Sequence, residues 1–440
     1  MSGLLLAAPA SGAGKTTVTL GLLRALRDAG HAVRAAKAGP DYIDPRFHQA
    51  ACGAPCLNLD AWAMTPARLH SLAQGPGTLV VEGAMGLFDG APPDGRGSSA
   101  DLARILGLPV LLVIDAARMG QSVAAVAQGF ARFDAGVPVA GLILNRVGSA
   151  RHETMLRAAL HPLGLPVLGA IPRDAGLAHP SRHLGLVQAQ ERPDLAAFIA
   201  RAAATMAAHL DLNAILTIAA GASPLSAEQP PGLKPPAQRI AVAQDAAFAF
   251  AYPHLLADWR AAGAEIAFFS PLANEPAPAA DLIYLPGGYP ELHAGRLATA
   301  TNFMQSMKVA SETTAIYGEC GGYMTLGQVL TDADGVAHRM AGLLPLETSF
   351  AQRRLHLGYR HLTASMGPFP GRWAGHEFHY ATTIRAEGPP LYTATDAAGR
   401  DLPPMGLIRG RVSGSFAHLI DALPRTQALQ SQPGGIRTAP

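Results

Sequence analysis

Charged residues are scarce in this chain of 440 residues, at 15% of the total against about 25% in a typical soluble protein. Hydrophobic residues make up 49%, so the chain lacks the low hydrophobicity and high net charge that keep a polypeptide disordered. The apolar runs are short, and none approaches the ~20 residues that a membrane-spanning helix needs. The first residues also lack the basic segment of a secretory signal. The chain length predicts two or three folded domains, and the short apolar runs predict no membrane partner.

Neither sign of charge dominates, because 34 Lys and Arg residues face 32 Asp and Glu residues. Without an excess of basic residues we expect no nucleic-acid partner. The chain has only three cysteines, Cys52, Cys56 and Cys320, an odd number that fits a reducing cytoplasm. Cys52 and Cys56 have no second pair to complete a tetrahedral metal site, so we interpret them as buried thiols. Lysine is also scarce, and two of the four lysines, Lys15 and Lys37, fall in motifs described below.

A stretch rich in Pro, Gly, Ala and Ser, residues 218–238, divides the chain. It predicts a linker between a first domain of residues 1–217 and a second domain of residues 239–440. In the first domain, helical segments alternate with continuous apolar runs at residues 4–8, 78–82, 110–115, 141–145 and 167–171. Runs without polar alternation are typical of parallel strands buried on both faces, so we predict an α/β fold with a doubly wound parallel sheet. Ligands of such sheets bind at the carboxyl ends of the strands.

The loop after the first predicted strand, APASGAGKTT, has the pattern of a phosphate-binding P-loop, with Pro9 in place of the usual first glycine. Its glycines allow backbone N–H groups to approach phosphate oxygens, and Lys15 can reach the β and γ phosphates. The motif predicts ATP or GTP binding by Gly12, Gly14, Lys15, Thr16 and Thr17.

Two acidic segments are candidates to complete a magnesium site beside the phosphates. The segment KAGPDYIDP contains Asp41 and Asp44, and VVEGAMGLFDG places Glu82 at a strand end and Asp89 in a glycine-rich loop. An acidic residue at a strand end is often only a turn residue or a helix cap. Because both segments occur in one P-loop domain, and Mg²⁺ prefers carboxylate and hydroxyl oxygens, we predict Thr16, Asp41 and Glu82 as ligands. The role of Asp44 is left open.

The second domain is also predicted to be α/β, with strands at residues 239–244, 265–269 and 281–285. The segment YGECGGYM then places Cys320 in a Gly-x-Cys-x-Gly turn, which is typical of a nucleophile elbow. We expect this turn to hold the thiol at a helix N-terminus that lowers its pKa. Backbone N–H groups of Gly287 and Gly288 are candidates for an oxyanion hole, and His418 is the candidate base.

A zinc site is the alternative for the segment GHEFHY, which contains His376 and His379. Their spacing does not place two ligands on adjacent helical turns, and the segment is more typical of a strand surface. The cysteine elbow is the stronger indication of chemistry in this domain, because most buried cysteines lie outside such turns and are inert.

These motifs resemble those of the a,c-diamide synthases of corrin biosynthesis, which act on cobyrinic or hydrogenobyrinic acid. The resemblance covers nearly the whole chain in the family's order: APASGAGKTT, KAGPDYIDP, VVEGAMGLFDG, LILNRV, GAIP, LPGGYPE, YGECGGYM, GHEFHY and GSFAHL. It implies a dethiobiotin-synthetase-like N-terminal domain and a C-terminal class I glutamine amidotransferase domain. It also implies that Cys320 is the glutaminase nucleophile and His418 its base. Ile420 stands where most triad enzymes have a glutamate, which leaves the third, orienting carboxylate open.

The reaction implied is amidation of the a- and c-acetate carboxylates with ATP and glutamine. Hydroxide is a poor leaving group, so ATP would convert the carboxylate to an acyl phosphate, with Mg²⁺ and Lys15 neutralising the phosphoryl group. Free ammonia is mostly protonated at neutral pH, so Cys320 would release it from glutamine through a thioester. The resemblance places Tyr42, Ile43 and Asp89 near the corrin substrate, and we expect Lys37 to help stabilise negative charge there. We expect Asn145 to contact the adenine.

Three alternatives stay open. A partitioning-type P-loop ATPase switch would carry a signature lysine where this chain has Ala10, and would have no use for Cys320. Nickel-sirohydrochlorin a,c-diamide synthase and cobyric acid synthase are closer relatives that amidate other substrates or other carboxylates. The Ala- and Arg-rich composition suggests a GC-rich genome, which favours metal-free hydrogenobyrinic acid over the cobalt-containing substrate. We expect a cytoplasmic enzyme, and a homodimeric assembly is left open.

Overall fold

A computed structural model describes the chain except at residues 1, 178–180, 183–184, 229 and 425–440. Residue 229 of the expected linker and the last sixteen residues of the expected second domain therefore lie outside the described residues. The chain divides into two units: residues 1–90, 96–231 and 252–254 form the first, and residues 91–95, 232–251 and 255–440 the second. No described helix is both long enough and apolar enough to cross a membrane.

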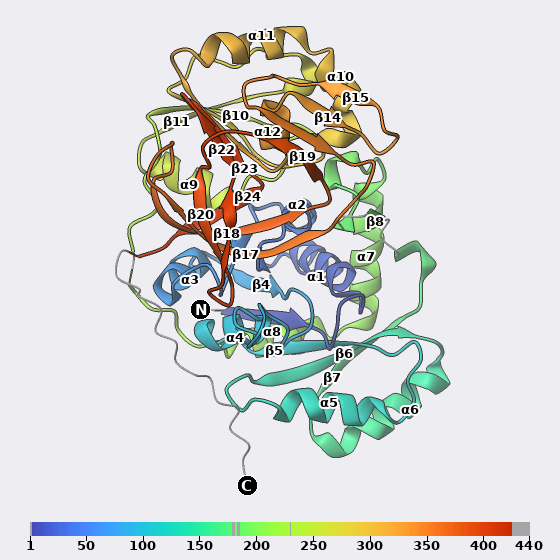
Figure 1. Cartoon of the computed structure of the whole chain (residues 1–440). Helices are drawn as coiled ribbons and strands as arrows, with labels where there is room; N and C mark the ends of the chain where they lie inside the picture. Colours follow the sequence, from blue (N-terminus) through green and yellow to red (C-terminus); the bar gives the residue numbers. More distant parts are fainter. Residues whose placement is uncertain (1, 178–180, 183–184, 229, 425–440) are drawn as a thin grey trace. The chain divides into compact units, whose positions relative to one another are not determined.

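The first unit is built on a seven-stranded sheet in the order β3-β2-β4-β1-β5-β6-β7 (Figure 1). Every neighbouring pair is parallel, which confirms the predicted parallel sheet. The strands are β1 (Ser2–Ala7), β2 (Val33–Ala38), β3 (Leu57–Leu59), β4 (Thr78–Glu82), β5 (Val110–Asp115), β6 (Val139–Val147) and β7 (Val167–Pro172). The apolar-run criterion missed β2 because its sequence, VRAAKA, is interrupted by Arg34 and Lys37.

Helices connect these strands and flank the sheet. They are α1 (Lys15–Asp28), α2 (Asp44–Cys52), α3 (Pro66–Ala73), α4 (Ser99–Leu106), α5 (Val123–Arg132), α6 (Ala150–Leu160), α7 (Leu195–His209) and α8 (Leu212–Ala220), and a short strand pair, β8 (Ser181–Arg182) and β9 (Gly185–Leu186), precedes α7. Helix α1 lies beside α7 (Figure 1), and a methyl group on Gly21 would come within 2.6 Å of the Ala202 carbonyl oxygen. Helix α8 ends at Ala220, so the first three residues of the expected linker are helical.

The second unit contains three sheets. A six-stranded sheet has the order β11-β10-β12-β13-β23-β22 and is parallel except at β22. Its strands are β10 (Arg239–Ala243), β11 (Glu265–Phe269), β12 (Leu282–Leu285), β13 (Ala315–Glu319), β22 (Leu407–Arg409) and β23 (Val412–Ser415). The accompanying helices are α9 (Pro253–Ala261), α10 (Ala294–Ala298), α11 (Thr301–Ala310) and α12 (Gly321–Leu326).

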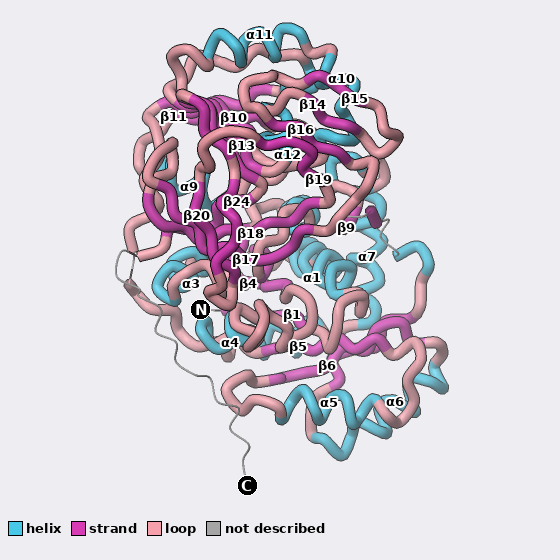
Figure 2. Tube along the Cα trace, in the orientation of Figure 1, coloured by secondary structure: helices cyan, strands magenta, loops and turns pink. Residues whose placement is uncertain are grey.

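The two other sheets were not predicted from the sequence. One has the order β15-β14-β16-β19, and the other is antiparallel with the order β21-β20-β17-β18-β24 (Figure 2). Their strands are β14 (Val329–Thr331), β15 (Ala337–Arg339), β16 (Leu346–Ser349), β17 (His356–Ala364), β18 (Gly371–His379), β19 (Thr382–Ala386), β20 (Tyr392–Asp396), β21 (Asp401–Met405) and β24 (Ala417–Ala422). Many of these strands are partly exposed and lack the apolar runs used for prediction.

One segment near the C-terminus joins two of these sheets. Strand β23 pairs with β13, where Ser415 is the partner of Glu319, and the backbone N–H of Cys320 donates to the Ser415 carbonyl at 2.8 Å. The chain then enters the antiparallel sheet as β24, where His418 pairs with His376. Because β23 and β24 are separated by a single residue, the register of β23 on β13 also sets where His418 lies.

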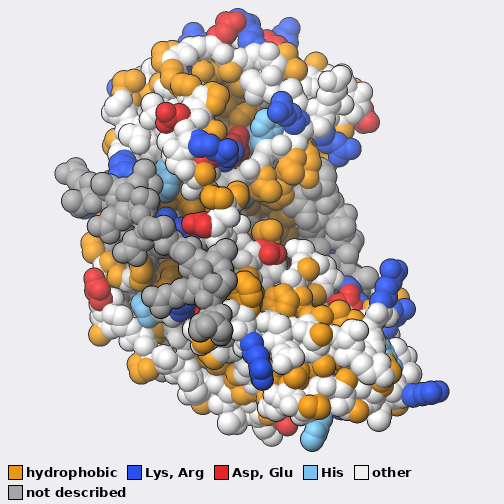
Figure 3. Space-filling model, turned by 60° about the horizontal axis from the view of Figure 1, so that its bottom comes forward, with side chains coloured by type: hydrophobic (Ala, Val, Ile, Leu, Met, Phe, Trp, Pro, Cys, Tyr) orange, Lys and Arg blue, Asp and Glu red, His pale blue; other side chains and the backbone are white. Residues whose placement is uncertain are grey.

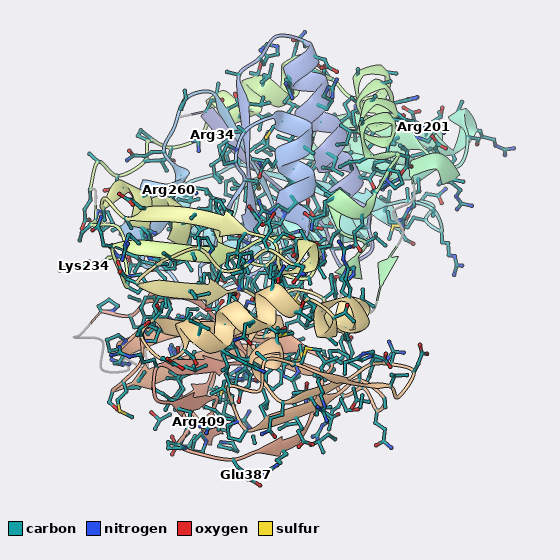
Figure 4. The ribbon with its side chains drawn as sticks, turned by 90° about the horizontal axis from the view of Figure 1, so that it is seen from above. Arg34, Arg201, Lys234, Arg260, Glu387 and Arg409 are labelled. Atoms are coloured by element: carbon teal, nitrogen blue, oxygen red, sulfur yellow. The ribbon has the colours of Figure 1, made fainter. Side chains whose placement is uncertain are left out.

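Most charged side chains are dispersed over the surface. On the face shown in Figure 3 they are scattered singly among apolar and uncharged groups. Glu387 and Arg409, labelled in Figure 4, are exposed at the periphery of the second unit. Buried charges are few, which makes a concentration of them around Lys37 and Glu82 in the first unit a candidate functional site.

Candidate active sites

The P-loop is held in place by residues that end β6. The side chain of Asn145 donates through Nδ2 to the Ala13 carbonyl at 2.8 Å, and Arg146 donates through Nη1 to the Gly12 carbonyl at 2.9 Å. Gly14 has a φ of 89°, and a methyl group there would lie 2.3 Å from Nδ2 of Asn145. The structure therefore gives Asn145 a role in shaping the loop, and its expected contact with adenine stays a prediction.

A cavity of about 870 Å³ lies in the first unit beside the ends of β5 and β6. Its lining includes Asp115, Arg118, Met119, Arg146 and Arg173. Arg146 also contacts the P-loop backbone, so the cavity adjoins the predicted phosphate site. The lining presents both signs of charge, because Asp115 and Asp174 lie among the three arginines and Arg146 is paired with Asp115. Sequence reasoning did not assign it, because its residues follow three different strands.

Lys37 and Glu82 are register partners on β2 and β4 and form the centre of a buried charge cluster. The Nζ atom of Lys37 lies 2.6 Å from Oδ2 of Asp44 and 2.9 Å from Oε1 of Glu82. The hydroxyl of Thr16, at the start of α1, donates to the same Oε1 at 2.8 Å. The fold thus brings Thr16, Lys37, Asp44 and Glu82 together from four elements.

Asp41 lies at the edge of this cluster. Its Oδ1 accepts hydrogen bonds from the backbone N–H groups of Ile43 and Asp44 at 2.8 and 3.0 Å, and its Oδ2 lies 3.8 Å from Nζ of Lys37. The Oδ2 atom of Asp44 lies 3.5 Å from Oγ1 of Thr16, the P-loop hydroxyl. Thr16, Asp44 and Glu82 form an oxygen donor set that fits Mg²⁺, so Asp44 joins the predicted ligands as a candidate.

The cluster controls the protonation of its own members. Burial raises the pKa of Glu82, but Lys37 and His48 outweigh this effect and hold that pKa well below its usual range. Burial, together with the charge of Asp41, raises the pKa of Asp44 to about 6. Burial lowers the pKa of Lys37, but Asp44 and Glu82 outweigh it, and the net pKa is well above the usual value. Lys37 and Glu82 are therefore both charged at neutral pH.

His48 belongs to this site and was missed from the sequence. It is fully buried, and its Nε2 lies 2.6 Å from Oε2 of Glu82. His48 follows Asp44 by one turn of α2, so both side chains face the same side of the helix. The four-residue spacing between Asp44 and His48 was the feature of the sequence that could have identified His48.

The other predicted residues of the first unit have different surroundings. Lys15 donates to the Met85 carbonyl, and burial lowers its pKa. The predicted substrate residues Tyr42 and Ile43 are only 9% and 8% exposed. Asp89 is exposed, and its Oδ2 accepts a hydrogen bond from the Gly86 backbone N–H at 2.9 Å. Contact of these last three residues with a substrate stays a prediction.

In the second unit, Cys320 occupies a strained turn between β13 and α12. Its φ of 46° and ψ of −102° lie where residues with side chains are rarely found. A methyl group on Gly318 would lie 2.7 Å from the backbone nitrogen of Tyr323, and one on Gly322 would lie 2.0 Å from the Leu285 carbonyl oxygen. Only glycine fits at these two flanking positions, as the elbow motif requires.

The expected lowering of the Cys320 pKa is wrong for this structure. Burial and the nearby carboxylate of Glu291 raise the pKa of the thiol, and they outweigh the hydrogen bond from the Gly321 backbone. Helix α12 has only six residues, so its N-terminal partial charge is small. The thiol therefore needs a base to remove its proton.

His418 lies beside the thiol. A methyl group on Gly287 would lie 2.8 Å from Nε2 of His418 and 3.2 Å from Cβ of Cys320, so both side chains adjoin the same glycine. His418 is fully buried on β24. A methyl group on Gly321, the residue that follows Cys320, would lie 3.0 Å from the backbone nitrogen of Gly288. The structure brings together Cys320, His418, Gly287 and Gly288, as the sequence predicted, while their catalytic roles stay a prediction.

The alternative zinc pair is not formed. His376 and His379 are three residues apart on β18, and residues at that spacing point to opposite faces of a strand. Instead, His379 lies with His356 and Glu377, whose potential ligand atoms are within 4.8 Å of one another. Arg360 donates to Glu377 at 3.0 Å, and the rings of His356 and His379 are stacked with centroids 4.6 Å apart. Glu377 is paired with both Arg360 and His379, and we interpret the group as a stacked ion-pair network.

Two protein-family models match the chain. The model of the CobQ/CobB/MinD/ParA nucleotide binding domain matches residues 4–187, and that of the CobB/CobQ-like glutamine amidotransferase domain matches residues 239–423. The first covers the P-loop and the buried charge cluster, and the second covers the cysteine elbow and His418. Fold and sites thus define a class: a P-loop nucleotide-binding domain joined to a glutamine amidotransferase domain.

Similarity to curated proteins shows which family of this class the chain belongs to. The hydrogenobyrinate a,c-diamide synthase of Brucella anthropi is 57% identical over 431 residues, which cover 96% of this chain and 99% of that protein. The synthase of Rhizobium meliloti is 56% identical with the same coverage. That of Rhodobacter capsulatus is 54% identical over 435 residues, 95% of this chain and 98% of that protein. The chain belongs to the hydrogenobyrinate a,c-diamide synthase family.

Proposed function

We propose that the protein amidates the a- and c-acetate carboxylates of hydrogenobyrinic acid in cobalamin biosynthesis, using ATP and glutamine. The observation that carries this proposal is the 57% identity over 96% of the chain to proteins named for that reaction. The two matched domains correspond to its two half-reactions. We place the enzyme in the cytoplasm, where ATP and glutamine are available.

The first unit activates the substrate carboxylate. Lys15 leaves the Met85 carbonyl to bind phosphate oxygens, and the backbone of Gly12 and Gly14 approaches the phosphates. Magnesium held by Thr16, Glu82 and a carboxylate of the Asp41–Asp44 turn would neutralise charge on the transferred phosphoryl group. Lys37 contacts both Asp44 and Glu82 and keeps these carboxylates ionised.

The carboxylate of the substrate attacks the γ-phosphorus of ATP, and ADP leaves. Ammonia then attacks the resulting acyl phosphate. The amide forms, and inorganic phosphate leaves. We assign four residues to the substrate side of this site: Lys37, Tyr42, Ile43 and Asp89. We assign Asn145 and the cavity beside β5 and β6 to the nucleotide side.

The second unit releases the ammonia. The Cys320 thiol passes its proton to Nε2 of His418 and forms a bond to the side-chain carbonyl carbon of glutamine. The Gly287 and Gly288 backbone N–H groups stabilise the oxyanion. The imidazolium then returns the proton to the amide nitrogen, ammonia leaves, and water hydrolyses the thioester to glutamate. A base is required because the pKa of the Cys320 thiol is raised.

A panel of macrocycles tests the assignment. The purified protein is incubated with ATP, Mg²⁺ and glutamine, and each of three substrates: hydrogenobyrinic acid, its cobalt-containing counterpart and nickel-sirohydrochlorin. Mass spectrometry counts the amides formed. Two amides on hydrogenobyrinic acid, and none without ATP, support the proposal. Four or more amides would point to a cobyric acid synthase, and preference for nickel-sirohydrochlorin to the other diamide synthase.

A further inference from the structure

The carboxylate of Glu319 lies next to the proposed base. Its Oε2 is 3.5 Å from Nδ1 of His418, and both side chains are almost completely buried, at 2% and 0% exposure. Nδ1 is the ring nitrogen opposite Nε2, which lies beside Gly287, the glycine that Cys320 also adjoins. Glu319 thus occupies, relative to the imidazole, the position of the orienting acid in a catalytic triad.

An apolar residue occupies the position where this acid is usually found. Ile420 is two residues after His418 and is fully buried. Glu319 comes from a different strand: it is the last residue of β13, immediately before Cys320. The pairing of β13 with β23 brings this residue close to a histidine 99 residues later in the chain.

Two hydrogen bonds fix the carboxylate. The Leu419 backbone N–H donates to Oε1 at 3.1 Å, across 100 residues of sequence. The hydroxyl of Tyr284, on β12, donates to Oε2 at 2.7 Å. Because Leu419 directly follows His418, the first bond ties Glu319 to the backbone that carries the imidazole. A separation of 3.5 Å is long for a hydrogen bond, but such bonds commonly tighten when substrate binds.

We propose that Glu319 is the third, positioning member of the glutaminase site. It accepts a hydrogen bond from Nδ1–H of His418, which leaves Nε2 unprotonated and directed at the Cys320 thiol. When the thiol proton moves to Nε2, the glutamate stabilises the imidazolium, and when the proton passes to the departing ammonia the imidazole becomes neutral again. The glutamate itself takes no part in the proton transfer. This inference rests on the proposed roles of Cys320 and His418.

The test compares Glu319→Gln with wild type in amidation assays with glutamine or with ammonium as the nitrogen donor. Glutamine at this position retains an oxygen that can accept from Leu419 but removes the negative charge. We expect the glutamine-dependent kcat to fall about 10-fold or more, with the KM for glutamine within about 2-fold and ammonium-dependent amidation unchanged. Tyr284→Phe is the matched control, since it removes one bond to Glu319 and keeps the charge, and it should lose much less activity.

Each other outcome has a defined meaning. A glutamine-dependent kcat that falls less than 10-fold would overturn the role of Glu319, as would a change confined to KM, which would indicate a glutamine-binding residue. Loss of ammonium-dependent activity as well would indicate a structural role only, and so would an equal loss in Tyr284→Phe. Cys320→Ala is run in parallel: if it retained glutamine-dependent activity, the proposed glutaminase site itself would be wrong, whatever the result for Glu319.

Discussion

The Nε2 atom of His48 lies 2.6 Å from Oε2 of Glu82, and the two side chains are 0% and 1% exposed. The other oxygen of this carboxylate accepts from Thr16 and contacts Lys37. Both oxygens of Glu82 therefore have close polar neighbours. Neighbours that hold a carboxylate in place orient it for a ligand role.

His48→Ala should weaken the metal site. We expect amidation with either nitrogen donor to fall about 10-fold, with a matching rise in the Mg²⁺ concentration needed for half-maximal rate, because the loss of a buried partner of a ligand typically costs 10–100-fold in metal affinity or activity. A magnesium titration of the initial rate measures this effect. His31→Ala is the control, since His31 is an exposed residue of the same unit. An unchanged magnesium requirement in His48→Ala would show that Glu82 needs no such support.

Lys15→Ala and Glu82→Gln should each abolish amidation, whether glutamine or ammonium is supplied. Both substitutions remove a charge from the proposed phosphoryl-transfer site, and ammonia from any source still requires an activated carboxylate. The measurement is product formation with each donor, while glutamine hydrolysis reports that the second unit is folded. Near-normal turnover with ammonium in either variant would mean that the synthetase centre lies elsewhere.

Gly14→Ala should weaken ATP binding far more than Gly12→Ala. Both glycines have positive φ, 89° and 82°, so the backbone strain is similar. Only at Gly14 would the new methyl group collide, 2.3 Å from Nδ2 of Asn145, whereas at Gly12 nothing lies within 4 Å. Calorimetric titration with ATP gives the two affinities. If the collision is the cause, Gly14→Ala combined with Asn145→Ala should recover part of the loss.

Cys320→Ala should separate the two half-reactions. We expect no glutamine-dependent amidation and retained amidation at high ammonium concentration and alkaline pH, because only the ammonia supply depends on the thiol. Cys52→Ala, which removes a different buried thiol, should keep both activities. Loss of both activities in folded Cys320→Ala would place Cys320 in the synthetase chemistry instead.

Glu377 should stabilise the protein in a pH-dependent way. Burial raises the pKa of this carboxyl, but His379 and Arg360 outweigh burial and lower the pKa to about 2. The stabilisation is present above the unfolded pKa of about 4.5 and is lost as the pH falls towards 2, and it amounts to on the order of 2–3 kcal/mol. The difference in thermal midpoint between wild type and Glu377→Gln should therefore shrink from pH 5 to pH 2.5. A constant difference over this range would contradict the ion-pair network.

The sequence alone determined the features that depend on local chain geometry. The P-loop needs glycine at a position of positive φ. The cysteine elbow needs glycine at position 322, because a methyl group there would lie 2.0 Å from the Leu285 carbonyl oxygen. Both motifs are therefore visible in the sequence as residue types at fixed spacing. The apolar runs of β1, β4 and β5 predicted buried parallel strands because strands covered on both faces cannot alternate with polar residues. The search for apolar runs missed strand β2 because its buried Lys37 belongs to the charge cluster and not to the hydrophobic core.

The tertiary structure decided which polar residues act together. The sequence favoured Asp41 over Asp44 as a ligand, but the start of α2 places Asp44 against Thr16 and Lys37. His48 lies one turn after Asp44 on the same face of α2, and this position brings it to Glu82. Glu319 meets His418 only because β13 pairs with β23 in one register, and a shift by one residue would turn its side chain to the other face. Such contacts depend on strand pairing and helix packing between segments far apart in the chain, and no local pattern records them.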